Sequence, residues 1–144
     1  MEPQLKRLAI ENYDQIIELW AVAGLPFRPH GRDSRELMAK EMNFPGAAFF
    51  GLYVDELMVG VCIANYDGRR GWINRLAIHP DFRGKKLSHI LIEAGEKFLY
   101  SIGAHVICAL IEELNYPSMT TFNKAGYNCE EHLHYFAKRP SADM

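Results

Sequence analysis

A loop with the chemistry of an anion-binding site follows Ile78. The apolar run before it stops at His79-Pro80, and a basic stretch, Asp81-Phe82-Arg83-Gly84-Lys85-Lys86, leads into a helical pattern. The first turn of a helix has up to four N–H groups without intrahelical partners and a partial positive charge, which suits phosphate. A solvated basic loop is the plainer alternative. The candidate phosphate-binding residues are Arg83, Gly84, Lys85, Lys86, Leu87, Ser88 and His89.

A second cationic segment lies earlier, between two predicted helices. Arg28, His30 and Arg32 alternate with proline and glycine in a stretch that cannot form regular structure. Arginine can donate two parallel hydrogen bonds to a carboxylate or a phosphate. We expect Arg28 and Arg32 to bind an anionic part of a substrate, with an ordinary solvated loop as the alternative.

The composition is that of a globular domain. The chain has 144 residues, of which 49% are hydrophobic and 24% are charged, and its formal net charge is −2. That charge gives no overall attraction to nucleic acid, and no apolar run approaches the length of a membrane span. Met1-Glu2-Pro3-Gln4 lacks the features of a signal peptide, and three cysteines make a disulfide framework improbable. We predict one cytoplasmic domain, residues 1–144, with neither nucleic acid nor membrane as a partner.

The hydrophobic periodicity predicts alternating strands and helices that would hold these loops. Residues 57–66 are apolar at both alternating sets of positions, as expected for an inner strand that is covered on both faces. The predicted fold is α/β, a mixed central sheet with helices on both faces. The predicted order is strand 5–10, helices 12–23 and 34–42, strands 47–54, 57–66 and 72–78, helix 85–102, strand 105–111, helix 115–126 and strand 132–138.

The sequences of two segments resemble motifs of the GNAT N-acetyltransferase superfamily. Residues 76–88 are similar to its acyl-CoA loop, a Leu-Ala-Val-His-Pro-like string followed by Arg/Gln-x-x-Gly-x-Gly/Ala, although Lys86 and Ser88 replace the usual small residues. Residues 115–127 are similar to Asn-x-x-Ala-x-x-x-Tyr-x-x-x-Gly-Phe, with Phe122 at the tyrosine position. Two motifs in the right order are more specific than either alone.

The resemblance implies a GNAT-like fold with a mixed, mostly antiparallel central sheet. It also implies an enzyme that uses acetyl-CoA as co-substrate and no metal. In the family the sheet splays at this point, so the backbone of Leu76, Ala77 and Ile78 would pair with pantetheine and Asn115 would hold it from the other side. Phe122, at the position of the family tyrosine, would lie in the same cofactor site. We expect Lys86 to adopt a helical φ, which a side chain tolerates.

Acetyl transfer to an amine requires a base, since only the neutral amine attacks the thioester. Glu112 and Glu113 follow a predicted strand directly and would point to opposite faces, so at most one can serve; Glu112 is the preferred candidate. A solvated acidic strand end is the alternative. The CoA thiolate that leaves in this reaction can take a proton from an acid. Phe122 has no hydroxyl to supply it, so Tyr116 or Tyr135 could substitute, or no acid is needed.

The sequence therefore predicts an N-acetyltransferase that moves an acetyl group from acetyl-CoA to a primary amine by direct attack in a ternary complex. A catalytically silent acyl-CoA-binding regulatory module is the alternative from a different class. A homodimer formed through the last strands is compatible with this fold. The identity of the amine is not encoded in any of these motifs.

Overall fold

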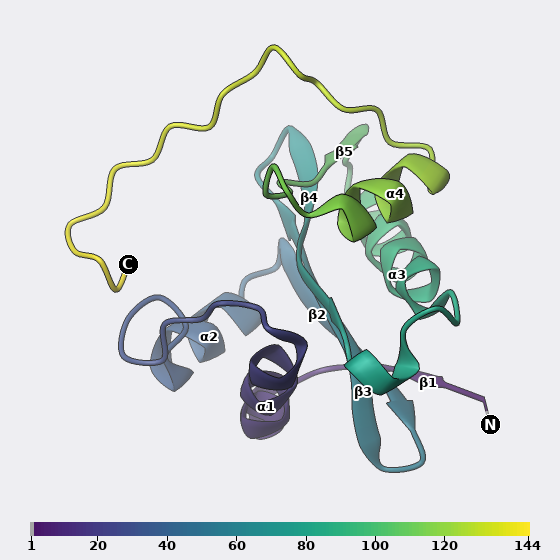
Figure 1. Ribbon diagram of the computed structural model, residues 1–144. Coiled ribbons are helices and arrows are strands. Elements are labelled where there is room, and N and C mark those ends of the chain that lie inside the picture. The colour runs from purple at the N-terminus through teal and green to yellow at the C-terminus, as the bar shows by residue number, and fades with distance from the viewer. Residues whose placement is uncertain (1) are drawn as a thin grey trace.

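The computed structural model describes residues 2–144 and contains one five-stranded sheet in the order β1-β2-β3-β4-β5 (Figure 1). Strands β1 to β4 pair antiparallel with their neighbours, and β5 pairs parallel with β4. This confirms the mixed, mostly antiparallel α/β fold. The strands are β1 (Gln4–Arg7), β2 (Ala47–Val54), β3 (Leu57–Tyr66), β4 (Arg70–Ile78) and β5 (Val106–Cys108), and the helices are α1 (Tyr13–Ala23), α2 (Arg35–Met42), α3 (Leu87–Ser101) and α4 (Tyr116–Lys124), with short 3-10 turns at Ile10–Asn12 and Pro80–Phe82.

Helices cover both faces of the sheet, α1 and α2 on one side and α3 and α4 on the other (Figure 1). Strand β3 carries both cores, since Val61 and Ile63 pack on the α1 side while Val59 and Cys62 pack on the α3 side. This two-sided burial explains why the strand is apolar at both sets of alternating positions. The predicted bounds of β2 and β3 are confirmed.

The helices begin and end where the local sequence indicates. Ser34 accepts a hydrogen bond from the amide of Leu37 and so caps α2, and the Asn115 side chain caps α4 by accepting one from the amide of Ser118. Gly24, with φ of 78°, ends α1 in the left-handed conformation. Asn12 sits at the cap position of α1, but its side chain bonds to Ala9, Gln15 and Tyr53 instead.

Two strand predictions at the end of the chain are wrong in whole or in part. The strand predicted for residues 105–111 is shortened to β5, and residues 132–138 form no strand. Leu133 and Phe136 are 67% and 91% exposed, on a segment that runs away from α4 and returns towards α2 (Figure 1). A strand needs a partner, and alternation alone supplies none. The homodimer through the last strands stays a prediction.

Strands β4 and β5 separate soon after they meet. Their pairing covers Arg70 with Val106, Gly71 with Ile107 and Trp72 with Cys108, and it ends there. Beyond that point β4 continues to Ile78 with β3 on its other side, so the edge of β4 that faces away from β3 opens into a V (Figure 1). The splay implied by the sequence resemblance is confirmed.

A bulge lies at the centre of the open part of β4. Asn74 pairs with Ile63 and Ala77 with Val61, so that Arg75 and Leu76 together oppose the single residue Cys62. Arg75 adopts a left-handed φ of 56°, which is rare for a residue with a side chain. The bulge turns the Arg75 side chain towards α1, where its guanidinium lies 4.2 Å from the centre of the Trp20 ring.

Candidate functional site

The loop after β4 enters α3 through two left-handed residues. Gly84 has φ of 79° and Lys86 has φ of 62°, and α3 begins at Leu87 instead of Lys85. The helical φ that the sequence analysis expects for Lys86 is wrong, because Lys86 keeps a conformation that glycine adopts freely. No side chain caps the first turn of α3. The amides of that turn therefore form a donor set for an anion.

The basic side chains of the loop are partly committed to the protein itself. Arg83 donates through Nε to the carbonyl of Ile78 at 3.2 Å and through Nη2 to the carbonyl of Ala23 at 3.1 Å. Arg83 therefore ties the loop to the end of α1. Lys85 lies over the ring of Phe82, with Nζ 5.3 Å from its centre. Lys86, Ser88 and His89 make no side-chain hydrogen bond within residues 2–144.

The backbone of Leu76, Ala77 and Ile78 lies at the open edge of β4, directly before this loop. Ala77 pairs with Val61 and Ile78 with Gly60 on the β3 side, which leaves the opposite edge without a strand. The carbonyl of Ile78 already accepts from Arg83. A ligand with amide groups could lie along this edge and replace the missing strand.

Helix α4, which follows β5 in the chain, carries Asn115 and Phe122. The Asn115 side chain is used as the helix cap, with Oδ1 3.2 Å from the amide of Ser118. Phe122 is 5% exposed and packs edge-on against Tyr127, with ring centres 5.0 Å apart. Its ring is thus part of the core. Tyr127 donates to Glu96 at 2.7 Å, and burial together with that carboxylate raises the pKa of its hydroxyl.

The catalytic candidates lie on the segment between β5 and α4. Glu112 and Glu113 are both exposed, and the carbonyl of Glu112 accepts from the amide of Asn115 at 3.0 Å. Tyr116, at the start of α4, is 64% exposed. Neither the Glu112 carboxylate nor the Tyr116 hydroxyl has a hydrogen-bond partner within residues 2–144, and both are open to solvent.

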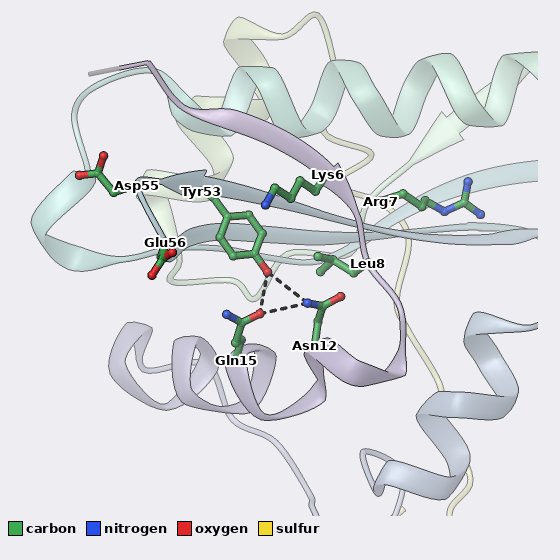
Figure 2. A pocket seen from close by; sticks show the side chains of 8 residues that line it. All are labelled: Lys6, Arg7, Leu8, Asn12, Gln15, Tyr53, Asp55 and Glu56. Carbon is green, nitrogen blue, oxygen red and sulfur yellow. Dashed lines mark hydrogen bonds between the residues drawn. The ribbon is translucent and has the colours of Figure 1, made fainter.

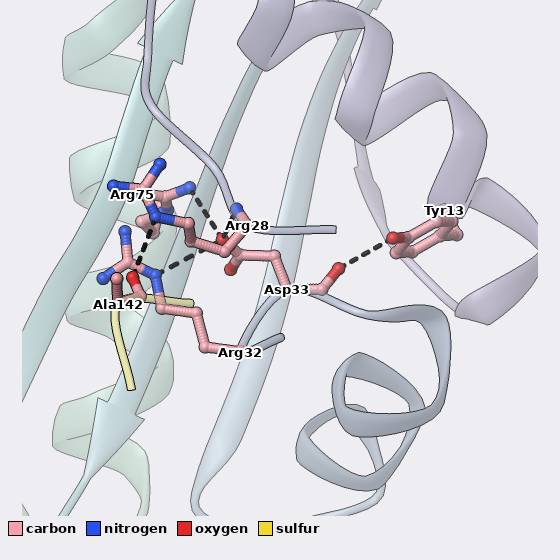
Figure 3. A network of polar contacts seen from close by, with 6 residues as sticks. All are labelled: Tyr13, Arg28, Arg32, Asp33, Arg75 and Ala142. Atoms are coloured by element: carbon pink, nitrogen blue, oxygen red, sulfur yellow. Dashed lines mark hydrogen bonds and ion pairs between the residues drawn. The ribbon is translucent and has the colours of Figure 1, made fainter. Parts of the chain in front are cut away.

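The cationic loop is organised around one buried carboxylate, that of Asp33 (Figure 3). Oδ2 of Asp33 accepts from the amide of Arg28 at 2.7 Å, lies 3.4 Å from Nε of Arg32, and lies 3.5 Å from Nη2 of Arg75. Its backbone carbonyl accepts from the hydroxyl of Tyr13 at 2.7 Å. The loop between α1 and α2 is thereby fixed beside the bulge of β4.

Arg75 is a residue that the sequence analysis did not single out. Its Nε and Nη2 are buried and have no hydrogen-bond partner within residues 2–144, although Asp33 balances the charge. Burial lowers the pKa of Arg75, and the Asp33 carboxylate acts in the opposite direction. A charged residue inside an apolar strand is the signal that could have revealed it.

Two hollows lie between α1 and the β2–β3 turn. One, of about 390 Å³, contains Tyr53 with Asn12 and Gln15 bonded to its hydroxyl (Figure 2). The other, of about 350 Å³, is lined by α1, the β2–β3 turn and His79. His79, directly after β4, lines the second hollow, and neither hollow is lined by Arg28, Arg32 or residues 83–89.

Within residues 2–144 no helix is both long enough and apolar enough to cross a bilayer. The same residues contain no group of three histidine, cysteine or acidic side chains placed to hold a metal ion.

Several solved structures share this fold. The PaiA N-acetyltransferase from Thermoplasma acidophilum, in complex with coenzyme A, is 20% identical with a TM-score of 0.75, over 90% of this chain and 92% of that one. The aminoglycoside acetyltransferase meta-AAC0020 from an uncultured soil metagenomic sample, in complex with trehalose, is 18% identical with a TM-score of 0.78, over 96% and 97%. The ribosomal-protein-alanine N-acetyltransferase from Brucella melitensis biovar Abortus 2308 is 14% identical with a TM-score of 0.71, over 96% and 99%.

The family comparison covers both motifs and strands β2 to β5. The model of the acetyltransferase (GNAT) family matches residues 13–127, from the start of α1 to Tyr127, and leaves the tail outside. The chain belongs to the acetyltransferase (GNAT) family.

Proposed function

We propose that this chain transfers an acetyl group from acetyl-CoA to a primary amine, by direct attack of the amine on the thioester in a ternary complex. The observation that carries the proposal is the open edge of β4. Pairing with β5 ends at Trp72, and the free edge at Leu76 to Ile78 leads directly to the uncapped first turn of α3. One continuous surface thus offers a strand partner for amides and a donor set for phosphates.

The residues present fit acetyl-CoA at both ends of that surface. Pantetheine contains two amides and can extend along the edge of β4, and the pyrophosphate suits the amides at Leu87, Ser88 and His89 with the charge of Lys86 nearby. Lys85 can contribute its charge from its position over Phe82. Arg83 acts through position, because its guanidinium holds the loop against Ile78 and Ala23.

The proton of the acceptor ammonium must leave before attack. A lysine amine with a pKa near ~10.4 is neutral in only a small fraction of molecules at pH 7, so a nearby base helps the reaction. Glu112 is the proposed base, supported by its exposed carboxylate and by the hydrogen bond that its carbonyl accepts from the amide of Asn115. Tyr116, exposed at the start of α4, is the proposed proton donor to the departing thiolate.

The acceptor is proposed to be an amine that also carries a carboxylate or a phosphate. Arg28 and Arg32 lie in the loop that Asp33 fixes beside the bulge of β4, and this bulge directly precedes the edge proposed for the cofactor. An amine acceptor is also supported by two aminoglycoside acetyltransferases of the same fold, 14% and 16% identical to this chain, one in complex with the bisubstrate analog CoA-S-monomethyl-acetylneamine and the other with sisomicin.

The experiment that tests this function is an assay of thiol release. Purified protein is incubated with acetyl-CoA and, separately, with neutral amines, amines that carry a carboxylate and peptides with free N-termini. We expect release of CoA to depend on the amine and the product to be an N-acetyl amide by mass spectrometry. Glu112→Gln should lower kcat while acetyl-CoA binding persists. Release of CoA at the same rate without any amine would contradict the proposal.

A silent acyl-CoA-binding module is the second candidate, and Phe122 is the observation in its favour. The residue at the family's tyrosine position has no hydroxyl and is buried, so the usual proton donor is absent. Binding of acetyl-CoA without release of CoA in the presence of any amine would favour this alternative.

A further inference from the structure

Residues 128–144 form a tail after α4. The end of this tail lies against the cationic loop. Nε of Arg28 donates to the carbonyl of Ala142 at 3.3 Å, and the amide of Arg32 donates to the carbonyl of Asp143 at 3.2 Å (Figure 3 shows the first of these partners). Within residues 2–144 these two are the hydrogen bonds that join the tail to the rest of the fold. The tail is held at its end.

The loop has a place for a peptide backbone at Gly31. A Cβ on Gly31 would collide with the carbonyl of Asp143 and would lie 2.8 Å from its carbonyl carbon. Gly31 itself does not adopt a left-handed φ, so the loop conformation does not require glycine. The absence of a side chain at this position therefore serves the close approach of the tail.

The rest of the tail does not hold this end in place by packing. Leu133, Tyr135 and Phe136 are 67%, 68% and 91% exposed. A segment with so little burial opens easily. The contact with the loop must therefore come from what the loop and Ser141–Met144 offer each other.

The chemistry of the two partners is complementary. The loop offers the guanidinium of Arg28 and the amide of Arg32, and the guanidinium groups of Arg32 and Arg75 share the single carboxylate of Asp33. The tail offers two backbone carbonyls and the acidic residue Asp143. Both contacts are made to backbone carbonyls, so a short peptide is the ligand that this surface suits.

The contact lies close to the proposed site of transfer. Asp33 binds the loop to Arg75, which directly precedes Leu76 and the open edge of β4. A segment seated on Arg28, Gly31 and Arg32 occupies the loop that we assign to the anionic part of the acceptor.

From these observations we infer that the loop Arg28–Asp33 is a peptide-binding surface, that Ser141–Met144 occupies it in the resting protein, and that this segment competes with the amine acceptor. The competition rests on the proposed function, whereas occupation of the loop by the tail does not. The acceptor class that follows is a peptide-like amine with an acidic group.

Hydrogen exchange tests occupation of the loop without any assay of activity. The amide of Arg32 donates to the tail, whereas the amides of Gly31 and Asp33 donate to the carbonyl of Arg28 inside the loop. In a variant that ends at Arg139, we expect exchange at Arg32 to rise by about tenfold, with Gly31 and Asp33 unchanged as internal controls. A peptide of residues 136–144, added to that variant, should restore protection at Arg32. Equal exchange in both proteins would overturn the inference.

Acceptor kinetics test the competition. If the tail covers the loop for half of the time or more, its removal lowers the acceptor KM by about twofold or more, with the KM for acetyl-CoA unchanged. Gly31→Ala in the full chain should also raise exchange at Arg32, because its Cβ would collide with the backbone of Asp143. An unchanged KM despite faster exchange at Arg32 would overturn the competition. Failure of the proposed function itself would differ from both, since neither protein would then release CoA with any amine.

Discussion

Oδ2 of Asp33 lies 3.5 Å from Nη2 of Arg75, and this pair joins the loop between α1 and α2 to the bulge of β4. The guanidinium of Arg75 is held from the other side by the ring of Trp20. Both side chains are largely buried, at 12% exposure for Asp33 and 22% for Arg75. The pair positions the proposed acceptor loop against the proposed cofactor edge.

Removal of the Asp33 carboxylate should destabilise the protein. Asp33→Ala leaves the Arg75 guanidinium buried without its counter-charge and removes the acceptor for the amide of Arg28. We expect a loss of about 2–4 kcal/mol in the free energy of unfolding. The exposed pair of Glu93 and Lys97 supplies the control, since Glu93→Ala should cost less than about 1 kcal/mol. Urea denaturation measures both, and equal losses would contradict the role given to Asp33.

The conformation of Lys86 predicts opposite effects of glycine at two neighbouring lysines. Lys86 has a positive φ of 62°, whereas the φ of Lys85 is not positive. Lys86→Gly should stabilise the protein by about 0.5–1 kcal/mol because it relieves the left-handed strain. Lys85→Gly removes the same charge and should destabilise the protein by about 0.5–1 kcal/mol. Thermal unfolding of both variants decides, and a loss of stability in Lys86→Gly would refute the left-handed conformation.

The turn between β3 and β4 should respond to acid through Asp67. Hydrogen bonds from the amide of Arg70, the indole of Trp72 and the amide of Arg69 lower the pKa of Asp67 from 3.8 to about 2. A lowered pKa in the folded state means that the stabilisation is present above pH 3.8 and is lost as the pH falls towards 2. Wild type should therefore exceed Asp67→Asn in unfolding temperature at pH 6, and the difference should shrink between pH 4 and pH 2.

The exposed carboxylate of Glu131 in the tail supplies a matched control for that titration. Glu131→Gln should follow the wild-type curve over the whole range. If the difference between wild type and Asp67→Asn stays constant down to pH 2, the hydrogen bonds to Asp67 do not favour its charged form.

The acceptor loop makes a prediction for Arg32. Its side chain lies on Asp33 and is 38% exposed, so it can turn to a ligand without leaving a buried charge behind. Arg32→Ala should raise the KM of a carboxylate-bearing amine by about tenfold, the loss expected for one charge-assisted hydrogen bond, with little change in its kcat. Arg69→Ala, in the β3–β4 turn, is a control that removes the same charge elsewhere. An unchanged acceptor KM would remove Arg32 from the site.

Local patterns were sufficient for most of the fold because each one reports on its own element. The apolar alternation in residues 47–54 and 57–66 gave both strands their observed bounds, and Ser34 and Asn115 mark the starts of α2 and α4. Residues 132–138 show where such reasoning ends. Their alternation is compatible with a strand, yet pairing depends on a partner far away in the sequence, and β5 is three residues long.

The candidate site also has a part that local sequence predicts and a part that it does not. The position of the basic loop before α3 could be predicted, because a basic glycine loop before a helix is a local signal, and its binding of phosphate stays a prediction. The conformation of Lys86 could not, since a lysine at this position gives no indication of a positive φ. The pairing of Asp33 with Arg75 spans 42 residues of sequence and depends on a bulge that no local pattern revealed.

The most direct test of the account is thermal unfolding of the full chain with acetyl-CoA, with CoA and with a matched adenosine nucleotide that lacks pantetheine. Occupancy at 100 times Kd stabilises the folded state by about 2.7 kcal/mol, which raises the unfolding temperature by several degrees. We expect a shift with both CoA species and a much smaller one with the nucleotide, because pantetheine is the part proposed to pair with the open edge of β4. No shift at millimolar ligand would contradict the proposed cofactor site and, with it, the proposed function.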